Sequence, residues 1–216
     1  MKIWRATKAD AADLCRRVPE FIPIVNGTEP PAFERCEDLF LALVQSIVSQ
    51  QLAVKAADAI FSRLKAALGE LTAENLLAAD FAALRACGLS GRKIEYLRGV
   101  ADAQRSKSVD FVALAQRPDA EVVAELVKLK GVGVWTAEML LIFALGRPDV
   151  LSLRDLGIRK GILMLTGRKT LSEEEFQRFR ARCSPCGTLA SLYLWRVKDG
   201  GLNVRSADPP PGRNCP

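Results

Sequence analysis

The stretch KGVGVWTAEML, residues 130–140, contains two glycines around a single valine within a region of helical periodicity. Apolar residues recur at helical spacing both before and after it. Because glycine tolerates backbone conformations that other residues avoid, we predict that one helix ends near Lys130 and that another begins near Val134 or Trp135. The sequence thus predicts two helices joined by a tight turn.

A turn of this kind at Gly131 and Gly133 exposes backbone N–H groups in front of a helix N-terminus, where the helix dipole is positive. Such a set of donors can hold a phosphate without any side chain. We therefore predict a phosphate-binding hairpin. A corner that serves only the packing of two helices is the alternative.

The composition is compatible with a nucleic-acid partner. The chain has 216 residues, a formal net charge of +6 and a sequence pI near 9.1, although a basic surface also serves solubility. It contains no histidine, which excludes His-based triads and two-His zinc sites. No apolar run approaches the roughly 20 residues of a membrane span, and the charged N-terminus lacks a signal core. We expect a soluble, intracellular protein.

Helical periodicity covers almost the whole chain. Thr7 followed by Asp10 predicts a capping box at the start of the first helix, and Gly69 and Gly146 predict two helix ends. No alternating strand pattern is strong. We predict an all-α fold of many short helices, in segments that include EDLFLALVQSIVSQQ, AVKAADAIFSRLKAAL, RKIEYLRGVADAQRS, TAEMLLIFAL, LGIRKGILML, EEEFQRFRARC and TLASLYLWRVK.

Six cysteines are scattered through the chain, and we expect free thiols. Cys183 and Cys186 have the spacing of a metal-binding pair, but Cys215 alone does not complete a four-ligand site with them, so we predict no metal there. The proline-rich residues 206–216 are expected to form a mobile tail.

Four motifs, in order along the chain, resemble those of one family. LKGVGVWTAEM is similar to the hairpin of the helix-hairpin-helix (HhH-GPD) DNA glycosylases, and GRPDVLSLRDLGIRKG is similar to the loop and catalytic aspartate that follow it. LVQSIVSQQLAVKAA resembles a motif upstream of the hairpin, and LYLWR resembles the closing helix of the alkylation-repair branch. The resemblance runs from about Asp38 to Arg196. The 3-methyladenine DNA glycosylase II type, without an N-terminal β domain, is the nearest branch.

The resemblance implies a single glycosylase domain over residues 1–216, built as a two-lobed helical bundle with a cleft between the lobes. Residues 38–146 would form the lobe that carries the wedge and the hairpin. Residues 1–37 together with 147–205 would form the other lobe.

Asp155 matches the catalytic aspartate of the family. A carboxylate there can stabilise the positive charge that develops on the sugar as the glycosidic bond breaks, and it can orient or deprotonate water. The alternative is a helix cap, since Ser152 and Asp155 have capping-box spacing, although the two roles are compatible. Many relatives have a second acid just before this aspartate, whereas this chain has Arg154, which could reach a phosphate.

Trp135 occupies the position at which bifunctional relatives have a nucleophilic lysine. An indole cannot form a Schiff base, so the resemblance implies a monofunctional glycosylase. It also implies a base pocket made of Trp135, Trp195, Met139 and Leu156, in which the indole faces attract a cationic alkylated purine. Both tryptophans could instead be core residues. A cationic base needs little protonation to leave, so we expect weak activity on neutral lesions such as hypoxanthine.

Gln51, as first choice, and Leu52 match the wedge of the family, which fills the gap left by the flipped nucleotide. A polar helix end is the alternative for this segment. Lys55, Arg92 and Lys93 could reach phosphates or remain solvated. The DNA-backbone contacts of the hairpin are assigned to Lys130, Gly131, Val132, Gly133 and Thr136.

The resemblance implies a monofunctional DNA glycosylase that flips and hydrolytically excises alkylated purines, such as 3-methyladenine and 7-methylguanine, from duplex DNA in base excision repair. The alternatives are a bifunctional glycosylase/AP lyase and a non-catalytic helix-hairpin-helix DNA-binding module. We expect no iron–sulfur cluster, because the cysteines do not reproduce the four-cysteine loop of some relatives. A monovalent cation at the hairpin is compatible with the family. We expect a monomer that acts on double-stranded DNA, without a membrane partner, in the cytoplasm (at the nucleoid in a bacterium, in the nucleus in a eukaryote).

Overall fold

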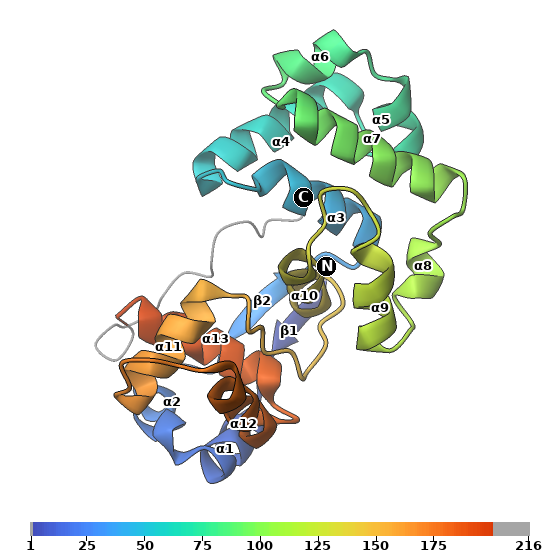
Figure 1. The fold of residues 1–216 in the computed structure, drawn as a ribbon. Helices are drawn as coiled ribbons and strands as arrows, with labels where there is room; N and C mark the ends of the chain where they lie inside the picture. The colour runs from blue at the N-terminus through green and yellow to red at the C-terminus, as the bar shows by residue number, and fades with distance from the viewer. Residues whose placement is uncertain (1, 201–216) are drawn as a thin grey trace. The chain divides into compact units, whose positions relative to one another are not determined.

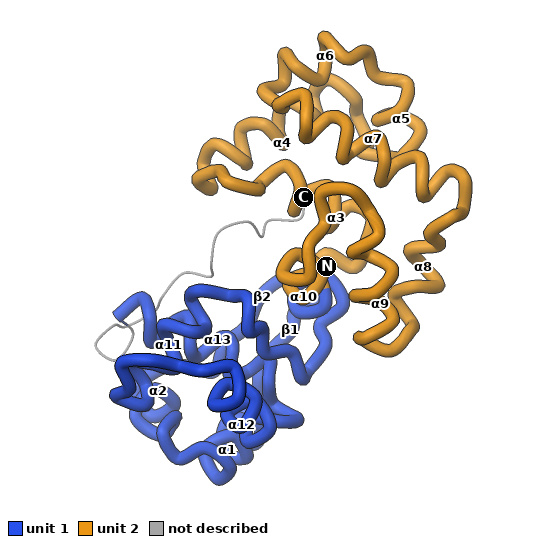
Figure 2. Tube along the Cα trace, viewed as in Figure 1, with its two compact units in different colours: residues 1–35, 141–210 blue, residues 36–140, 211–216 orange. Residues whose placement is uncertain are grey.

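The computed structural model describes residues 2–200, which fold as two units (Figure 1 and Figure 2). Residues 2–35 and 141–200 form unit 1, and residues 36–140 form unit 2. The second boundary lies before residue 141 rather than at 146/147, because Phe143 packs with its ring centroid 5.0 Å from Phe33 and 5.8 Å from Trp195, both in unit 1. The expected tail of residues 206–216 and Cys215 lie outside the described residues.

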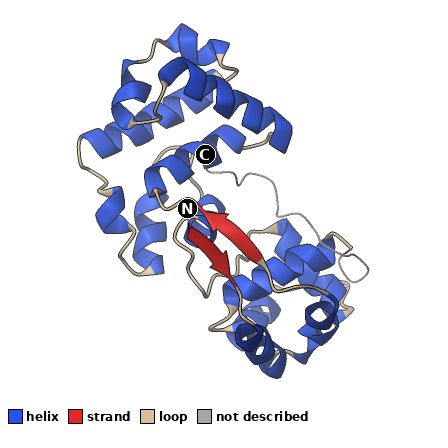
Figure 3. Cartoon of the chain, turned by 180° about the vertical axis from the view of Figure 1, so that it is seen from behind, coloured by secondary structure: helices blue, strands red, loops and turns tan. Residues whose placement is uncertain are grey.

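The all-α prediction is confirmed. Within residues 2–200 the chain forms thirteen α-helices, one short 3₁₀ helix and a single pair of strands (Figure 3). The strands β1 (Lys2–Arg5) and β2 (Ala32–Arg35) are antiparallel, and Trp4 stacks on Phe33 with ring centroids 5.2 Å apart. Four-residue strands are too short to produce a visible alternation, and the sequence analysis did not predict them.

Unit 1 is built around the packing of α11 (Leu156–Thr166) against α13 (Gly187–Lys198). A Cβ atom at Gly161 would overlap with the main-chain carbonyl of Leu194, so these helices approach each other closely because residue 161 has no side chain. Tyr193 of the second of these helices is fully buried, and so is Phe21, whose ring centroid lies 6.3 Å from that of Tyr193. The predicted capping box of Thr7 and Asp10 is present. The helical elements of unit 1 are α1 (Lys8–Arg17), η1 (Pro19–Phe21), α2 (Ile22–Gly27), α11 (Leu156–Thr166), α12 (Glu173–Cys183) and α13 (Gly187–Lys198).

Unit 2 is built around an apolar helix that neighbouring helices cover. Asp38 caps this helix, and its Leu43 and Ile47 side chains are fully buried. Gly69 ends the next helix with a φ of 70°, as predicted. The helices of unit 2 are α3 (Leu39–Ser49), α4 (Val54–Leu68), α5 (Ala73–Ala78), α6 (Phe81–Ala86), α7 (Gly91–Arg105), α8 (Phe111–Leu114), α9 (Asp119–Leu126) and most of α10 (Val134–Phe143).

No helix within residues 2–200 combines the length and the apolar character needed to cross a membrane.

Candidate functional site

The predicted hairpin connects α9 to α10. The first hydrogen bond of α10 runs from the N–H of Ala137 to the carbonyl of Gly133 at 3.0 Å, so α10 begins at Val134, as predicted. The N–H groups of residues 134–136 precede this bond and are not used by the helix itself. They are the donors that a phosphate at the helix N-terminus would meet.

The two glycines of the hairpin differ in what they contribute. Gly131 has a φ of +89°, and a Cβ atom there would overlap with the ring of Tyr96. Gly133 has no positive φ, and a Cβ atom there would meet nothing within 4 Å. The prediction that both glycines supply conformations unsuited to other residues is therefore wrong for Gly133, and of the two hairpin positions only Gly131 requires glycine.

The other hairpin residues assigned to DNA backbone contacts are held in different ways. The N–H of Val132 already donates to the carbonyl of Leu129 at 3.1 Å, so this donor serves the turn. The side chains of Val132 and Thr136 are buried. Lys130 is exposed, and its ammonium lies 3.4 Å from the carboxylate of Glu95, an exposed pair that solvent screens.

The candidate wedge residues lie in the turn between α3 and α4. Gln51 is exposed and has a φ of +58°, in the left-handed region that non-glycine residues avoid. Leu52 is 39% exposed, and its N–H donates to the carbonyl of Ser49 at 3.1 Å. Strained, exposed residues of this kind concentrate at functional sites.

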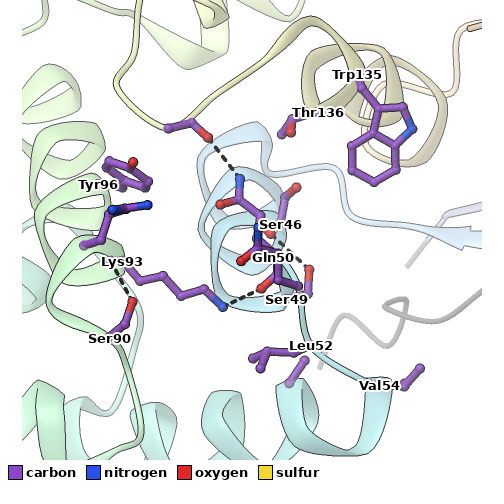
Figure 4. Close-up of a pocket in the computed structure, with 14 residues that line it drawn as sticks. Ser46, Ser49, Gln50, Leu52, Val54, Ser90, Lys93, Tyr96, Trp135 and Thr136 are labelled. Carbon is purple, nitrogen blue, oxygen red and sulfur yellow. Dashed lines mark hydrogen bonds between the residues drawn. The ribbon is translucent and has the colours of Figure 1, made fainter. Parts of the chain in front are cut away.

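Lys93 and Gln50 hold this turn in place (Figure 4). The ammonium of Lys93, from α7, donates to the carbonyls of Val48 at 2.6 Å and Gln50 at 2.8 Å. The side-chain amide of Gln50 donates to the carbonyl of Gly131 at 3.0 Å. Burial lowers the pKa of Lys93 below its ordinary value. Lys93 therefore caps the C-terminal end of α3, rather than being a solvated or phosphate-binding surface residue as the sequence analysis had it.

The wedge turn and the hairpin line one pocket of about 970 Å³ in unit 2 (Figure 4). Its lining includes Gln51, Leu52, Gly131 and Trp135. Trp135 is 42% exposed, and Met139 follows one turn later on the same face of α10. The sequence-predicted wedge, hairpin and two of the four base-pocket residues are thus gathered in this unit.

The other predicted site residues lie in unit 1, around Asp155. Asp155 is buried at the N-cap of α11, and its Oδ1 accepts hydrogen bonds from the N–H of Ile158 at 2.8 Å and from the indole N–H of Trp195 at 3.0 Å. The capping-box alternative is corrected in its detail: Asp155 itself is the N-cap, while Ser152 is buried in the preceding loop. Asp155 is thus both the helix cap and a carboxylate held in a fixed position.

Trp195 connects this carboxylate to the core of unit 1. Its ring is only 9% exposed and stacks on Phe143 with centroids 5.8 Å apart and 28° between the planes. Leu156, the last of the four predicted base-pocket residues, is 72% exposed directly after Asp155, and Arg154 is exposed directly before it. The observed contacts give Trp195 a role in orienting Asp155, beside the predicted role in stacking on a base.

The loop before Asp155 is held by hydroxyl groups of α13. Thr188 accepts a hydrogen bond from the N–H of Val150 at 3.1 Å and donates to the carbonyl of Arg147 at 2.6 Å. Ser191 donates to the carbonyl of Val150 at 2.8 Å. Thr188, Ser191 and Trp195 follow one another at helical spacing along one face of α13. Neither hydroxyl residue was predicted from the sequence, although two hydroxyl side chains among the apolar residues in the first half of this helix were a visible signal.

The sequence matches a family of known proteins. Residues 44–185 match the family of HhH-GPD superfamily base excision DNA repair proteins. The chain belongs to this family. The resemblance inferred from the four motifs is confirmed.

Curated relatives of this HhH-GPD protein include two yeast enzymes. The chain is 36% identical over 181 residues to DNA-3-methyladenine glycosylase 1 of Schizosaccharomyces pombe, covering 82% of this chain and 79% of that protein. It is 32% identical over 199 residues to DNA-3-methyladenine glycosylase of Saccharomyces cerevisiae, covering 88% of this chain and 67% of that protein.

Solved structures of related proteins share the HhH-GPD fold. DNA-3-methyladenine glycosidase from Bacillus halodurans superimposes with a TM-score of 0.81 at 32% identity, covering 92% of this chain and 93% of that one. The Schizosaccharomyces pombe 3-methyladenine DNA glycosylase in complex with abasic DNA gives a TM-score of 0.75 at 33% identity, covering 88% of this chain and 96% of that one.

The described cysteines of this HhH-GPD protein are free thiols. Cys183 is fully buried, and burial raises its pKa to about 12. The thiol of Cys186 lies 3.8 Å from the carboxylate of Asp13. No group of three or more cysteine, aspartate or glutamate side chains within residues 2–200 is arranged to hold a metal ion.

Proposed function

We propose that this HhH-GPD protein is a monofunctional DNA glycosylase that flips and hydrolytically excises alkylated purines, such as 3-methyladenine and 7-methylguanine, from duplex DNA. The relatives described above, named as 3-methyladenine DNA glycosylases, support the reaction and the substrate class. The observation that carries the proposal is the buried carboxylate of Asp155, whose Oδ1 is fixed by α11 and by Trp195. A capping role alone needs no indole donor.

The chemistry follows from where the charge develops. As the glycosidic bond breaks, the sugar acquires positive charge, and a preorganised carboxylate stabilises that charge without reorganising during the reaction. Two hydrogen bonds to one oxygen hold the carboxylate plane of Asp155 in a single orientation. The same carboxylate can orient or deprotonate the attacking water. The products are the free base and an abasic site.

Base release and Asp155→Asn test this proposal directly. Asparagine keeps the shape and is itself a good N-cap, so the substitution removes the charge while α11 keeps its cap. With duplex DNA treated with a methylating agent, we expect the wild-type protein to release free base and Asp155→Asn to be slower by about 100-fold or more, with DNA binding retained. A rate for Asp155→Asn within threefold of the wild type would reduce Asp155 to a cap. No release by the wild type would favour the DNA-binding module.

Trp135 is the reason for proposing a monofunctional glycosylase rather than a glycosylase/lyase. A lyase needs an amine that attacks the sugar, and an indole at this position supplies none. Lys130 is the amine of the hairpin itself, and it is paired with Glu95. Borohydride reduction in the presence of abasic duplex traps a Schiff base where one forms. We expect no trapped adduct, and an adduct that disappears in Lys130→Met would identify a lyase instead.

The substrate range and the cofactor requirement follow from the same chemistry. A cationic purine leaves without protonation by the enzyme, so we propose that 7-methylguanine is released faster than hypoxanthine, and equal rates would contradict this. Hydrolysis with one carboxylate and water needs neither a metal centre nor an iron–sulfur cluster, so treatment with EDTA should leave base release unchanged. We propose that the enzyme acts as a monomer, with a monovalent cation at the hairpin, on the DNA of the cell.

A further inference from the structure

The turn between α3 and α4 holds a conformation that its own residues do not favour. Gln51 has a φ of +58°, whereas glycine or asparagine is the usual residue in the left-handed region. α3 ends at Ser49, and its last carbonyls have no partner within the helix. A strained turn at an open helix end persists only when surrounding groups hold it.

Lys93 supplies such a group. Its ammonium donates to the carbonyl of Val48, at the end of α3, and to the carbonyl of Gln50, directly before the strained residue. The two bonds of 2.6 and 2.8 Å place a positive charge at the negative end of the α3 dipole. Burial lowers the pKa of Lys93, so the side chain gives up hydration to occupy this position.

The same face of α7 also supports the hairpin. Tyr96 lies one turn after Lys93, and its ring occupies the space that a Cβ atom at Gly131 would need. The carbonyl of Gly131 in turn accepts the hydrogen bond of the Gln50 amide. Lys93 and Gln50 therefore connect the turn that carries the candidate wedge to the hairpin that would hold the phosphate (Figure 4).

We propose that Lys93 is a positioning residue for nucleotide flipping, because together with Gln50 it fixes the strained wedge turn to the hairpin. Binding of the DNA backbone by the hairpin and insertion of the wedge then occur as one rigid motion. This inference rests on the proposed glycosylase function. In this scheme Lys93 acts through the main chain rather than through DNA, because two of its three N–H donors bind the carbonyls of Val48 and Gln50.

Lys93→Met tests the inference, because methionine keeps the apolar stem and removes the ammonium. The substrate is a duplex with 2-aminopurine next to 7-methylguanine, so that fluorescence reports flipping and a quenched assay reports base release. We expect the single-turnover rates of flipping and of base release to fall by roughly 10- to 100-fold, the size of effect that a misplacement of a positioning group by about 1 Å produces. Affinity for undamaged duplex should stay within about twofold, and the slope of log Kd against log salt should not change.

Arg92→Met is the matched comparison. Arg92 is the preceding residue, lines the same pocket and is exposed. If it meets a phosphate, its removal lowers the salt slope by about 1 and weakens binding to every duplex, without a specific defect in flipping. A phosphate-binding Lys93 would behave in this same way, so a reduced salt slope in Lys93→Met would overturn the inference.

Gln50→Leu keeps the inference testable if Lys93→Met folds poorly. It removes only the side-chain bond to Gly131, and we expect slower flipping with an unchanged salt slope. Flipping at the wild-type rate in either folded variant would overturn the inference. Failure of the proposed function has a different signature, because the wild-type protein itself would then release no base from methylated DNA.

Discussion

The indole nitrogen of Trp195 donates a hydrogen bond to Oδ1 of Asp155 over 3.0 Å, joining two residues that are 40 positions apart in the sequence. Each partner is fixed a second time. Trp195 stacks on Phe143, and Asp155 caps α11 through the N–H of Ile158. The orientation of the carboxylate is therefore set by the core of unit 1 rather than by the flexibility of a loop.

Trp195→Phe should separate the two roles of this tryptophan. Phenylalanine keeps an aromatic ring against Phe143 but offers no N–H to Asp155. A hydrogen bond to a charged acceptor contributes about 1.5–3 kcal/mol, so we expect single-turnover base release to slow by roughly 10- to 100-fold. The measurement is base release at saturating enzyme, with affinity for abasic duplex as the control. A rate equal to that of the wild type would show that the indole N–H is dispensable.

Thr188→Val should destabilise unit 1 although its size hardly changes. The substitution leaves the buried N–H of Val150 and the carbonyl of Arg147 without the hydroxyl that now bonds to them. We expect a loss of about 2–3 kcal/mol in the free energy of unfolding, measured by urea denaturation. Thr166→Val is the control, because the Thr166 hydroxyl bonds only to the carbonyl of Ile162 in its own helix. It should change the same free energy by less than about 0.5 kcal/mol, and equal losses would contradict the argument.

Gly131→Ala and Gly133→Ala should differ sharply. Alanine at residue 131 must adopt a positive φ and displace the ring of Tyr96, so we expect a loss of about 1–3 kcal/mol in stability. The side chain of alanine at residue 133 would meet open space. Alanine is a poorer N-cap than glycine, which lowers stability, but it also lowers the entropy of the unfolded chain, which raises stability. These two effects roughly cancel, so we expect the free energy of unfolding to stay within about 0.5 kcal/mol of the wild type. Thermal melts of both variants test this. Similar midpoints would show that the turn relaxes around residue 131.

The ion pair of Glu20 and Arg182 should make stability depend on acid pH. Two hydrogen bonds from Arg182, at 2.9 and 2.7 Å, lower the pKa of Glu20 below its ordinary 4.5. A lowered folded-state pKa means that the stabilisation is complete above pH 4.5 and is lost as the pH falls through the folded pKa. Because both side chains are partly exposed, we expect Arg182→Met to cost only about 0.5–1 kcal/mol at pH 7.

This cost should shrink as the pH falls below 4.5, and it should disappear once Glu20 is protonated in the folded state as well. Urea denaturation at several pH values measures it. Arg178→Met is the control, since its partner Glu174 is 81% exposed and its removal should change stability by no more than a few tenths of a kcal/mol at any pH. A pH-independent cost for Arg182→Met would assign the effect to packing instead.

The fold was largely predictable because its signals are local. Capping residues, helix-ending glycines and apolar spacing all act within a few residues of the chain, and they located the helices, the Thr7 capping box and the start of α10. The strands β1 and β2 were missed because their pairing depends on residues some 30 positions apart and on only four residues each.

For the candidate site, the family motifs led to the prediction of Asp155 and Trp135, whose roles in the reaction stay predictions. The site was not predictable where function depends on contacts between distant segments. In the sequence Lys93 is one basic residue among many, and only the fold places it at the end of α3. Gly133 matched the glycine pattern, yet the pattern does not say which glycine has a positive φ.

The close approach of Gly161 to the main chain of Leu194 affects how inherited or laboratory variants of this protein should be interpreted. Residue 161 lies six positions along the chain from Asp155, roughly 9 Å along the helix axis, and touches neither base nor sugar in the proposed reaction. Any larger residue there must push α11 away from α13, and the carboxylate at the tip of α11 would move with it. A screen for lost repair activity would then score a mutation at residue 161 as catalytic, although the chemistry is untouched and only the distance between two helices has changed.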